Sequence, residues 1–241
     1  MGEFTYVVER ECPICGKVTR IVKTKSRLLA QQVDEDFCVH YKGFNPYYYK
    51  IWFCEHCGYA ADEKRFTSPM ASRKKQKVRE FLEQKKIGIP FEEERTLPDA
   101  IAFYKLAIFY EELMDSPLNA RAGLYLAMSW IYRESGEKAK EEDAMLHAAE
   151  LYDRSLATEA YPFGKMTDNL AMYLVGAIYY RLKDYEKTAQ HLSRIISDQK
   201  IRNSDFATFK KARDLWQDVK IAREQMKKEA ASAKTDGVTQ E

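Results

Sequence analysis

Two cysteine couplets constrain this chain more than any other feature of its sequence. They are Cys12-Pro13-Ile14-Cys15-Gly16 and Cys54-Glu55-His56-Cys57-Gly58, two Cys-x-x-Cys hooks that are each followed by glycine. Each hook presents two sulfurs from one tight turn, and two hooks complete the tetrahedral thiolate set that holds Zn²⁺ at Zn–S distances of about 2.3 Å. The sequence therefore predicts one zinc site, whose ligands are Cys12, Cys15, Cys54 and Cys57.

Iron is the alternative metal for these four thiolates. Hooks of the form Cys-Pro-x-Cys-Gly also occur in rubredoxin-like electron carriers, which bind one iron through four thiolates. An electron carrier has no need of the long helical region that follows, so we favour zinc. Because protein would fill all four positions, the site would leave no open coordination position for catalysis.

The two hooks belong to a large module. Residues 16–53, thirty-eight in all, separate them, whereas a compact zinc ribbon has about 15–20 residues between its hooks. β-favouring residues at 6–8 and 18–22 flank the first hook and predict a hairpin with the hook at its tip. We therefore expect an enlarged zinc-ribbon-like unit over residues 1–66.

The segment between the hooks is rich in aromatic and turn-forming residues. Its pattern predicts four elements in succession. They are a short helix over 26–33, a strand over 37–41, a turn over 43–46 and an aromatic strand over 47–53 that leads into the second hook.

The fifth cysteine, Cys38, lies two residues before His40. A Cys/His pair can act as nucleophile and base, or as an alternative set of metal ligands. No activating partner for this thiol can be identified from the sequence, so we favour a small buried residue on a strand. His56 lies inside the second hook, and we expect its side chain to point away from a metal that the flanking cysteines already hold.

The composition is that of a globular protein. Of the 241 residues, 45% are hydrophobic and 13% aromatic, which is enough for a packed core. No apolar run approaches the roughly 20 residues of a membrane span, and the N-terminus lacks a basic head and an apolar signal core. Five cysteines, an odd number with four in metal spacing, suit a reducing compartment. We therefore expect a soluble, cytoplasmic protein without membrane contact.

Charge is unevenly distributed along the chain. Residues 1–90 carry 17 Lys+Arg against 11 Asp+Glu, a net charge of +6, and residues 91–241 carry 22 against 26, a net charge of −4. Part of the basic excess lies in a helix predicted from Ser68-Pro69 to Gly88, in a linking segment over 67–95. This helix lacks interleaved aromatics, so we favour a solvated connector over a nucleic-acid surface. The basic residues of its N-terminal half are Arg73, Lys74, Lys75, Lys77 and Arg79.

Residues 96–230 show the apolar period of 3.6 that predicts successive helices. The first should begin at Thr96 with a capping box, and the next should begin after Ser116-Pro117. Further helices are predicted from about Lys138 to Ser155, from Thr167-Asp168, from Tyr185 to about Asp198, and from Ser204, with an apolar stripe of Phe209, Ala212, Trp216, Val219 and Met226. We expect a small, polar, disordered tail over 231–241.

Residues 170–198 resemble a tetratricopeptide unit. Gly176 stands where the repeat needs a small residue for close helix approach, and Tyr179 stands where an aromatic fills the interior of the helix pair. Residues 124–156 look like a more divergent copy. An ordinary helical bundle is the alternative, but helix pairs recur at about the spacing of the repeat, so we favour a tetratricopeptide-like array.

Aromatic residues are frequent in these helices, and we expect most of them to fill the core and a minority to line a groove. His147 is expected to be structural or exposed, and His191 to lack a partner. The aromatic set comprises Phe103, Tyr104, Phe109, Tyr110, Tyr125, Tyr132, Tyr173, Tyr179 and Tyr180.

Several motifs together resemble a bacterial family known only as a domain of unknown function (family 2225). The resemblance is strong over residues 10–65 and thinner through the helices. It implies a four-cysteine metal module, with Cys12, Cys15, Cys54 and Cys57 as ligands, followed by a tetratricopeptide-like tail in the bacterial cytoplasm, and it implies no activity. The motifs are Cys12-Pro13-x-Cys15, Asp36-Phe37-Cys38, Tyr41-x-Gly43-x-Asn45-Pro46-x-x-Tyr49 and Trp52-x-Cys54-x-x-Cys57-Gly58-Tyr59-Ala60-Ala61.

The sequence predicts a mainly α protein with a small β module and no enzymatic activity. It contains no phosphate-binding glycine loop, His-Glu-x-x-His, Gly-x-Ser-x-Gly or dinucleotide fingerprint. The leading hypothesis is a zinc-binding interaction or scaffold protein that holds a protein partner in a helical groove. Nucleic-acid binding through the basic residues 1–90 is the alternative, and iron-based electron transfer is a weaker one.

Overall fold

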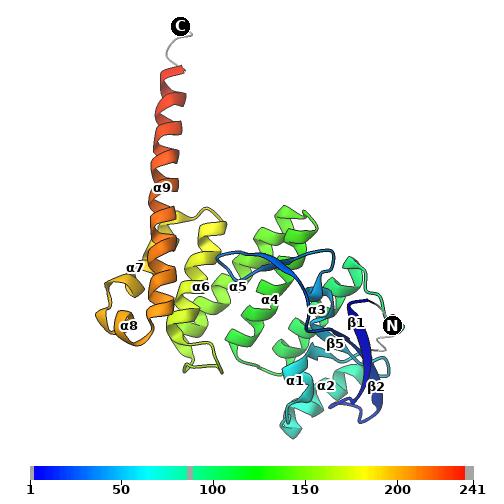
Figure 1. Cartoon of the computed structure of the whole chain (residues 1–241). Coiled ribbons are helices and arrows are strands. Elements are labelled where there is room, and N and C mark those ends of the chain that lie inside the picture. The colour runs from blue at the N-terminus through cyan, green and yellow to red at the C-terminus, as the bar shows by residue number, and fades with distance from the viewer. Residues whose placement is uncertain (1–2, 86–88, 237–241) are drawn as a thin grey trace. The chain divides into compact units, whose positions relative to one another are not determined.

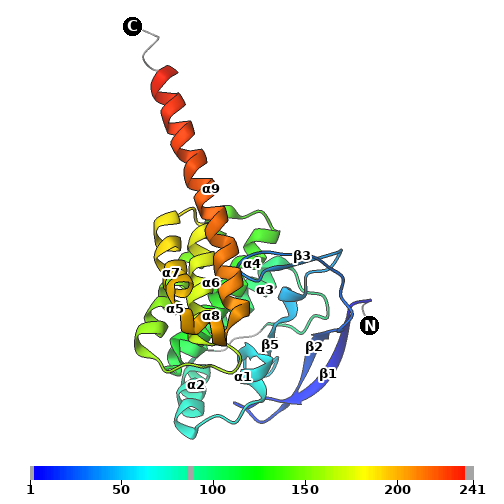
Figure 2. The same ribbon diagram turned by 60° about the vertical axis from the view of Figure 1, so that its left-hand side comes forward.

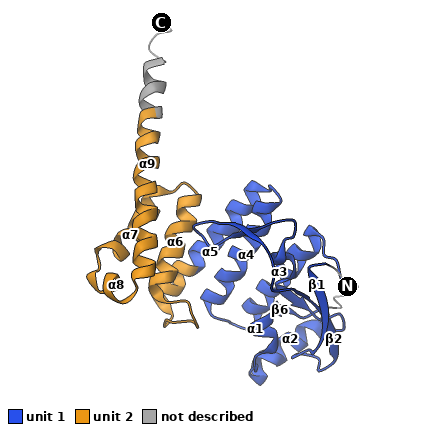
Figure 3. Ribbon diagram, in the orientation of Figure 1, with its two compact units in different colours: residues 1–151 blue, residues 152–241 orange. Residues whose placement is uncertain are grey.

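The computed structural model describes residues 3–85 and 89–236. The chain forms two compact units, residues 1–151 and residues 152–241 (Figure 3). The division falls within a helix, whereas the sequence places a boundary between the metal module and the helices, at residues 67–95. The confirmed fold class is mainly α with small antiparallel strand pairs near the N-terminus.

The first unit begins with the predicted hairpin. Strands β1 (Thr5–Glu11) and β2 (Val18–Thr24) pair antiparallel, in a register that sets Thr5 opposite Thr24 and Glu11 opposite Val18. They form the blue ribbon beside the N-terminus in Figure 1. Because Glu11 and Val18 close the pairing, the first hook lies at the tip of the hairpin, as the sequence predicts.

Two short strand pairs follow the hairpin. β3 (Ala30–Val33) pairs with β4 (Val39–Tyr41), and β5 (Ile51–Phe53) pairs with β6 (Ala60–Asp62), both antiparallel. The helix predicted over residues 26–33 is therefore wrong, because the second half of that segment is bonded to β4 as a strand. The strand predicted over residues 37–41 is confirmed for its last three residues.

The predicted aromatic strand over 47–53 is only half strand. Pro46–Tyr49 form a short 3₁₀ helix, η1, and β5 starts after it. The Asn45 side chain caps η1 by accepting a hydrogen bond from the Tyr47 backbone amide at 2.9 Å, and Pro46 occupies the first helical position. Asn-Pro is a helix-start signal that outweighs the β propensity of the tyrosines.

Two helices connect this region to the main helical layer. α1 (Glu63–Thr67) is not predicted from the sequence; the Asp62 side chain caps it by accepting from the Arg65 amide at 2.8 Å. α2 (Ser72–Gln84) starts later than the predicted Ser68-Pro69. The predicted stop at Gly88 lies outside the described residues.

The next three helices agree with the prediction. They are α3 (Leu97–Leu113), α4 (Leu118–Glu134) and α5 (Lys138–Thr158). At the start of α3 the Thr96 hydroxyl accepts from the Asp99 amide, and the Asp99 carboxylate accepts from the Thr96 amide at 2.9 Å, which completes the predicted capping box.

One hydrophobic core runs through the strands and helices of the first unit. The rings of Phe53 in β5 and Phe103 in α3 stack with centroids 4.8 Å apart, and the Tyr110 hydroxyl of α3 donates to the Gly58 carbonyl of the second hook at 2.9 Å. Figure 2 shows β5, α1 and α3 of this unit close together. The aromatic residues around the second hook are thus buried by α3, which explains why no division between compact units falls at residues 67–95.

The second unit consists of the end of α5 with α6 (Asp168–Arg181), α7 (Tyr185–Ser197), α8 (Gln199–Ser204) and α9 (Phe206–Asp236). A Cβ atom added at Gly176 in α6 would lie 3.0 Å from Leu192 Cδ2 in α7. The small residue therefore permits the close helix approach that the sequence predicts. The assignment to the tetratricopeptide family stays a prediction.

The C-terminal region differs from the prediction in three respects. Ser204 ends α8, and Asp205 caps α9 by accepting from the Thr208 amide at 3.2 Å. The apolar stripe stops short of Met226, which is 53% exposed. α9 continues to Asp236, whereas the sequence predicts disorder from residue 231; residues 237–241 lie outside the described residues. Within the described part of the chain, no helix is both long and apolar enough to cross a membrane.

Candidate metal centre

The four predicted ligands lie together. All four Sγ atoms are within 4.8 Å of one another, and the sulfurs of Cys12 and Cys57 and those of Cys15 and Cys54 are 3.7 Å apart. Four sulfurs placed tetrahedrally about 2.3 Å from one ion would stand about 3.8 Å from each other. The spacing of the thiols therefore fits a single tetrahedral metal ion.

Both hooks have the same backbone geometry. The amide of the first cysteine donates to the carbonyl five residues later, Cys12 to Lys17 and Cys54 to Tyr59, at 2.9 and 2.8 Å. The glycine amide then donates back to the carbonyl of that cysteine in each hook. Gly16 and Gly58 have φ of 73° and 85°, in the left-handed region that favours glycine. The repeated geometry explains why each hook ends in glycine.

The sulfur cluster is partly shielded from water. Cys12 and Cys54 are buried, Cys15 and Cys57 are half-buried, and all four are free of disulfides. Without metal the thiols share protons: the hydrogen bond with Cys54 raises the pKa of Cys12 to about 12, and bonds from Cys12 and Cys57 lower the pKa of Cys54. Metal binding would displace these protons, because thiolates are the ligands.

Neighbouring elements support both hooks. Arg79 of α2 donates from Nε to the Ile14 carbonyl in the first hook at 2.7 Å. Arg20 of β2 forms an ion pair with Glu55 in the second hook at 2.6 Å. Together with the bond from Tyr110 to Gly58, these contacts tie the hooks to β2, α2 and α3.

His56 does not belong to the ligand set. Its Nε2 lies 2.8 Å from the Val18 carbonyl of β2, and the residue is outside the group of four clustered sulfurs. The side chain thus contacts backbone, in agreement with the expectation that it points away from the metal.

Cys38 lies in a second group of potential ligands, with Asp34 and His40. Burial raises the pKa of the Cys38 thiol to about 12, so the thiol is protonated and not activated at neutral pH. His40 contacts Asp34 at 2.8 Å through Nε2 and Glu134 through Nδ1. Cys38 is fully buried, as predicted, but it lies one residue before β4 and not on the strand.

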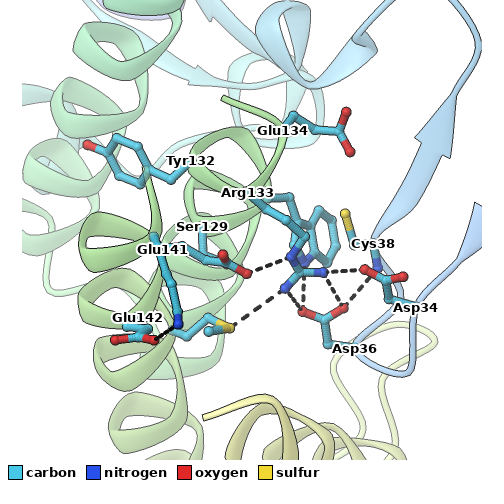
Figure 4. A network of polar contacts seen from close by, with 12 residues as sticks. Asp34, Asp36, Cys38, Ser129, Tyr132, Arg133, Glu134, Glu141 and Glu142 are labelled. Atoms are coloured by element: carbon cyan, nitrogen blue, oxygen red, sulfur yellow. Dashed lines mark hydrogen bonds and ion pairs between the residues drawn. The ribbon is translucent and has the colours of Figure 1, made fainter. Parts of the chain in front are cut away.

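A buried arginine pairs with the Asp34 carboxylate of that second group and with two further carboxylates. Arg133 of α4 forms ion pairs with Asp34 at 2.7 Å, Asp36 at 2.6 Å and Glu141 at 2.7 Å (Figure 4). Because a guanidinium already stands among these oxygens, they are stabilised without a metal ion. Sequence reasoning did not find this network, since nothing local relates Arg133 to carboxylates nearly a hundred positions earlier.

A groove lies along α3, α4 and α5 of the first unit, with a volume of about 680 Å³. Apolar and aromatic side chains, among them Phe109 and Tyr125, line it together with charged residues such as Lys105. Phe109 is 37% exposed, whereas Phe103, Tyr104 and Tyr110 are buried. The aromatics thus divide as predicted, into a buried majority and a minority on a groove.

The two remaining histidines differ in their surroundings. His147 lines the groove, is exposed, and stacks on Tyr125 with ring centroids 5.1 Å apart, as an exposed or structural role predicts. The expectation that His191 lacks a partner is wrong, because its Nε2 lies 3.3 Å from Asp153 and its ring stacks on Tyr179.

The basic helix α2 is partly engaged with its own chain. Lys77 forms an ion pair with Asp115 at the end of α3, and Arg79 contacts the first hook. These two of the five basic side chains therefore have structural partners in the first unit.

Comparison with known proteins assigns the chain to a family. Residues 6–219 match the model of a family described as "Uncharacterized protein conserved in bacteria (DUF2225)", and the chain belongs to this family. No curated protein and no solved structure matches the chain.

Proposed function

We propose that this DUF2225 protein is a non-enzymatic, zinc-stabilised interaction protein of the bacterial cytoplasm, and that the groove along α3, α4 and α5 receives a segment of a protein partner. The observation that carries the proposal is that the groove helices and the four-thiolate cluster belong to one hydrophobic core. A metal that closes the hooks therefore also stabilises the helices that line the groove.

Zinc is favoured by the donor set. Four sulfurs at tetrahedral spacing form a closed shell that suits a structural zinc ion, and this ion stabilises folds by fixing distant hooks together. Iron can occupy the same thiolates, so metal analysis has to separate the two. The closed shell and the protonated Cys38 both support a role without catalysis.

The shape of the groove favours a helical segment as its occupant. Its α3 lining runs from Leu97 to Glu112, a length of roughly 22 Å at 1.5 Å per residue. A helix of about four turns fits this length, with apolar anchors at spacings of three and four residues facing Phe109 and Tyr125.

The charges of the groove favour an acidic residue on that segment. Each acidic residue of the groove already has a partner in the chain: Glu112 is paired with Arg121 at 2.8 Å, Glu137 with Lys140, and Asp143 lies 3.7 Å from His147. Lys105 is exposed and has no ion pair among the contacts of the described residues. An acidic side chain of the partner would therefore meet Lys105.

Site-specific photocrosslinking tests the proposal. A photoreactive phenylalanine analogue is placed at Phe109 in the groove or at Phe206, which is 58% exposed on α9 and serves as the matched control. We expect one protein to crosslink at position 109 and not at 206, and the purified partner segment to bind at least about tenfold more weakly to Lys105→Glu.

Two results would contradict the proposal. One is equal capture at both positions. The other is capture that nuclease treatment abolishes, together with loss of binding when Arg73, Lys74 and Lys75 are changed to Glu while Lys105→Glu has no effect. The latter result would favour the nucleic-acid alternative, in which basic side chains bind phosphates in a salt-dependent manner.

A further inference from the structure

A pocket of about 540 Å³ lies in the first unit between β2, η1, β5 and the start of α1. It shares no lining residue with the groove along α3, α4 and α5, and none of the four hook cysteines lines it. Its volume is within the range of roughly 300–1,000 Å³ that is typical of pockets for small organic ligands. The pocket is thus a candidate site of a different kind from the protein groove.

Aromatic rings form one wall of this pocket. Trp52 and Tyr49 are almost fully buried, and other rings hold them in place: Phe66 contacts Trp52, and Phe44 stacks on Tyr49 with centroids 5.5 Å apart. Tyr41 is half-buried, and its hydroxyl has no hydrogen bond among the contacts of the described residues. The buried rings fix the wall, and the half-buried Tyr41 offers the area on which a flat ring can stack.

The lining of the pocket has more lysines than carboxylates. Three lysines and two carboxylates line the pocket, which leaves a formal net charge of +1. Lys23 is neutralised by Glu63 at 2.8 Å, and the Asp62 carboxylate caps α1. The positive charge that remains belongs to Lys50 and Lys64.

Lys50 lines the pocket without a carboxylate partner among the described residues. It is exposed to water, its ammonium lies 5.7 Å from the centre of the Trp130 ring, and no carboxylate of the described residues forms an ion pair with it. An exposed ammonium that lacks a counterion at the edge of a pocket can form a charge-assisted hydrogen bond with a bound anion.

We propose that this pocket binds a small anion that carries a flat aromatic ring, of the class of nucleoside monophosphates, with the anionic group held by Lys50 and Lys64 and the ring stacked beside Tyr41. The inference is independent of the proposed protein partner. The ligand needs both parts. Its anionic group gains from the lysines, which disfavour a cationic ligand, and its ring gains from the aromatic wall, which adds nothing to the binding of a bare phosphate ion.

Calorimetric titration of the full-length, metal-loaded protein tests this inference. The probes are the four common nucleoside monophosphates and the aromatic sulfonate 8-anilinonaphthalene-1-sulfonate, with adenosine and inorganic phosphate as the two halves of the ligand. We expect at least one aromatic anion to bind with one-to-one stoichiometry and a Kd below about 1 mM, and adenosine and phosphate to bind at least about tenfold more weakly.

Three variants locate the binding site. Lys50→Gln should weaken binding of the aromatic anion by roughly tenfold to a hundredfold, because it removes a charge-assisted hydrogen bond. Tyr41→Ala should weaken it by about fivefold or more through lost stacking. Lys42→Gln, an exposed lysine outside the lining, should leave binding unchanged. Circular dichroism and metal content verify that each variant is folded.

Each of several results would overturn the inference. They are the absence of saturable binding for every aromatic anion, binding that Lys50→Gln leaves unchanged, and binding of inorganic phosphate as tight as that of the aromatic anions. A single-stranded oligonucleotide that binds far more tightly than every mononucleotide, with the same dependence on Lys50, would also overturn it, since the ligand would then be a nucleic acid.

Discussion

Replacing Arg133 by methionine should be among the most damaging single changes in this protein. The side chain of Arg133 is 6% exposed, and it stands among Asp34, Asp36 and Glu141, which are 6%, 1% and 10% exposed. Methionine keeps much of the volume but removes the guanidinium that the three buried carboxylates share, and only Asp34 keeps a contact with His40. Breaking a buried ion pair from one side costs about 3–5 kcal/mol.

The loss can be measured by urea unfolding followed through tryptophan fluorescence. Trp130 reports directly, because its Nε1 donates to the Asp36 carboxylate at 3.2 Å. Thermal unfolding is the second measurement. At about 2–4 °C per kcal/mol for a unit of this size, its midpoint should fall by roughly 10 °C. Arg10→Met, at an exposed arginine of β1 in the same unit, should cost under about 0.5 kcal/mol.

A rescue variant separates the loss of charge pairing from a loss of packing. Combining Arg133→Met with Asp34→Asn and Asp36→Asn removes two of the three negative charges that surround Arg133, so part of the lost stability should return. A loss for Arg133→Met no larger than that for Arg10→Met would refute the reasoning. A triple variant less stable than Arg133→Met alone would also count against it.

Three further predictions concern other parts of the chain. A fragment that begins at Phe91 should lack the cooperative unfolding of the first unit, because the strands that cover α3 are missing; dispersed NMR signals from the residues of α3 and α4 in this fragment would contradict this. Burial lowers the pKa of His40, but hydrogen bonding to Asp34 and the charges of Asp34 and Glu134 outweigh this effect and raise the pKa in the folded protein. The stability that His40 contributes should therefore be full below about pH 6.5 and be lost as the pH rises through the folded pKa. The urea midpoints of wild type and His40→Gln should converge at high pH, and a difference that stays constant with pH would disprove the coupling. Gly176→Ala should destabilise the second unit by about 1–2 kcal/mol in thermal unfolding, since Leu192 is fully buried and cannot yield, and an unchanged midpoint would show that it can.

Local signals account for the parts of the fold that the sequence predicts correctly. The hooks follow from cysteine spacing and glycine conformation, and the start of α3 follows from Thr96 and Asp99, which lie three positions apart. The close approach at Gly176 follows from a local repeat pattern. Each of these depends on residues that are neighbours in sequence, so no knowledge of the tertiary structure is needed.

Long-range packing explains what the sequence does not predict. Residues 30–33 become a strand because β4 pairs with them, and this outweighs a weak helical pattern. The partnership of Arg133 with Asp36 spans 97 positions, and the shared core depends on which face of α3 meets the aromatic residues around the second hook. Neither the Arg133–Asp36 pair nor the packing face of α3 produces a periodic pattern or a motif of fixed spacing in a single sequence.

Elemental analysis of the purified protein tests the central claim most directly. We expect one zinc ion per chain, a Cys54→Ser variant with reduced zinc content, and a large loss of stability in the first unit when a chelator removes the metal, because the closed thiolate site lies in the core that supports the groove helices. A red protein with stoichiometric iron would contradict the claim. Unchanged stability after complete removal of the metal would do so as well.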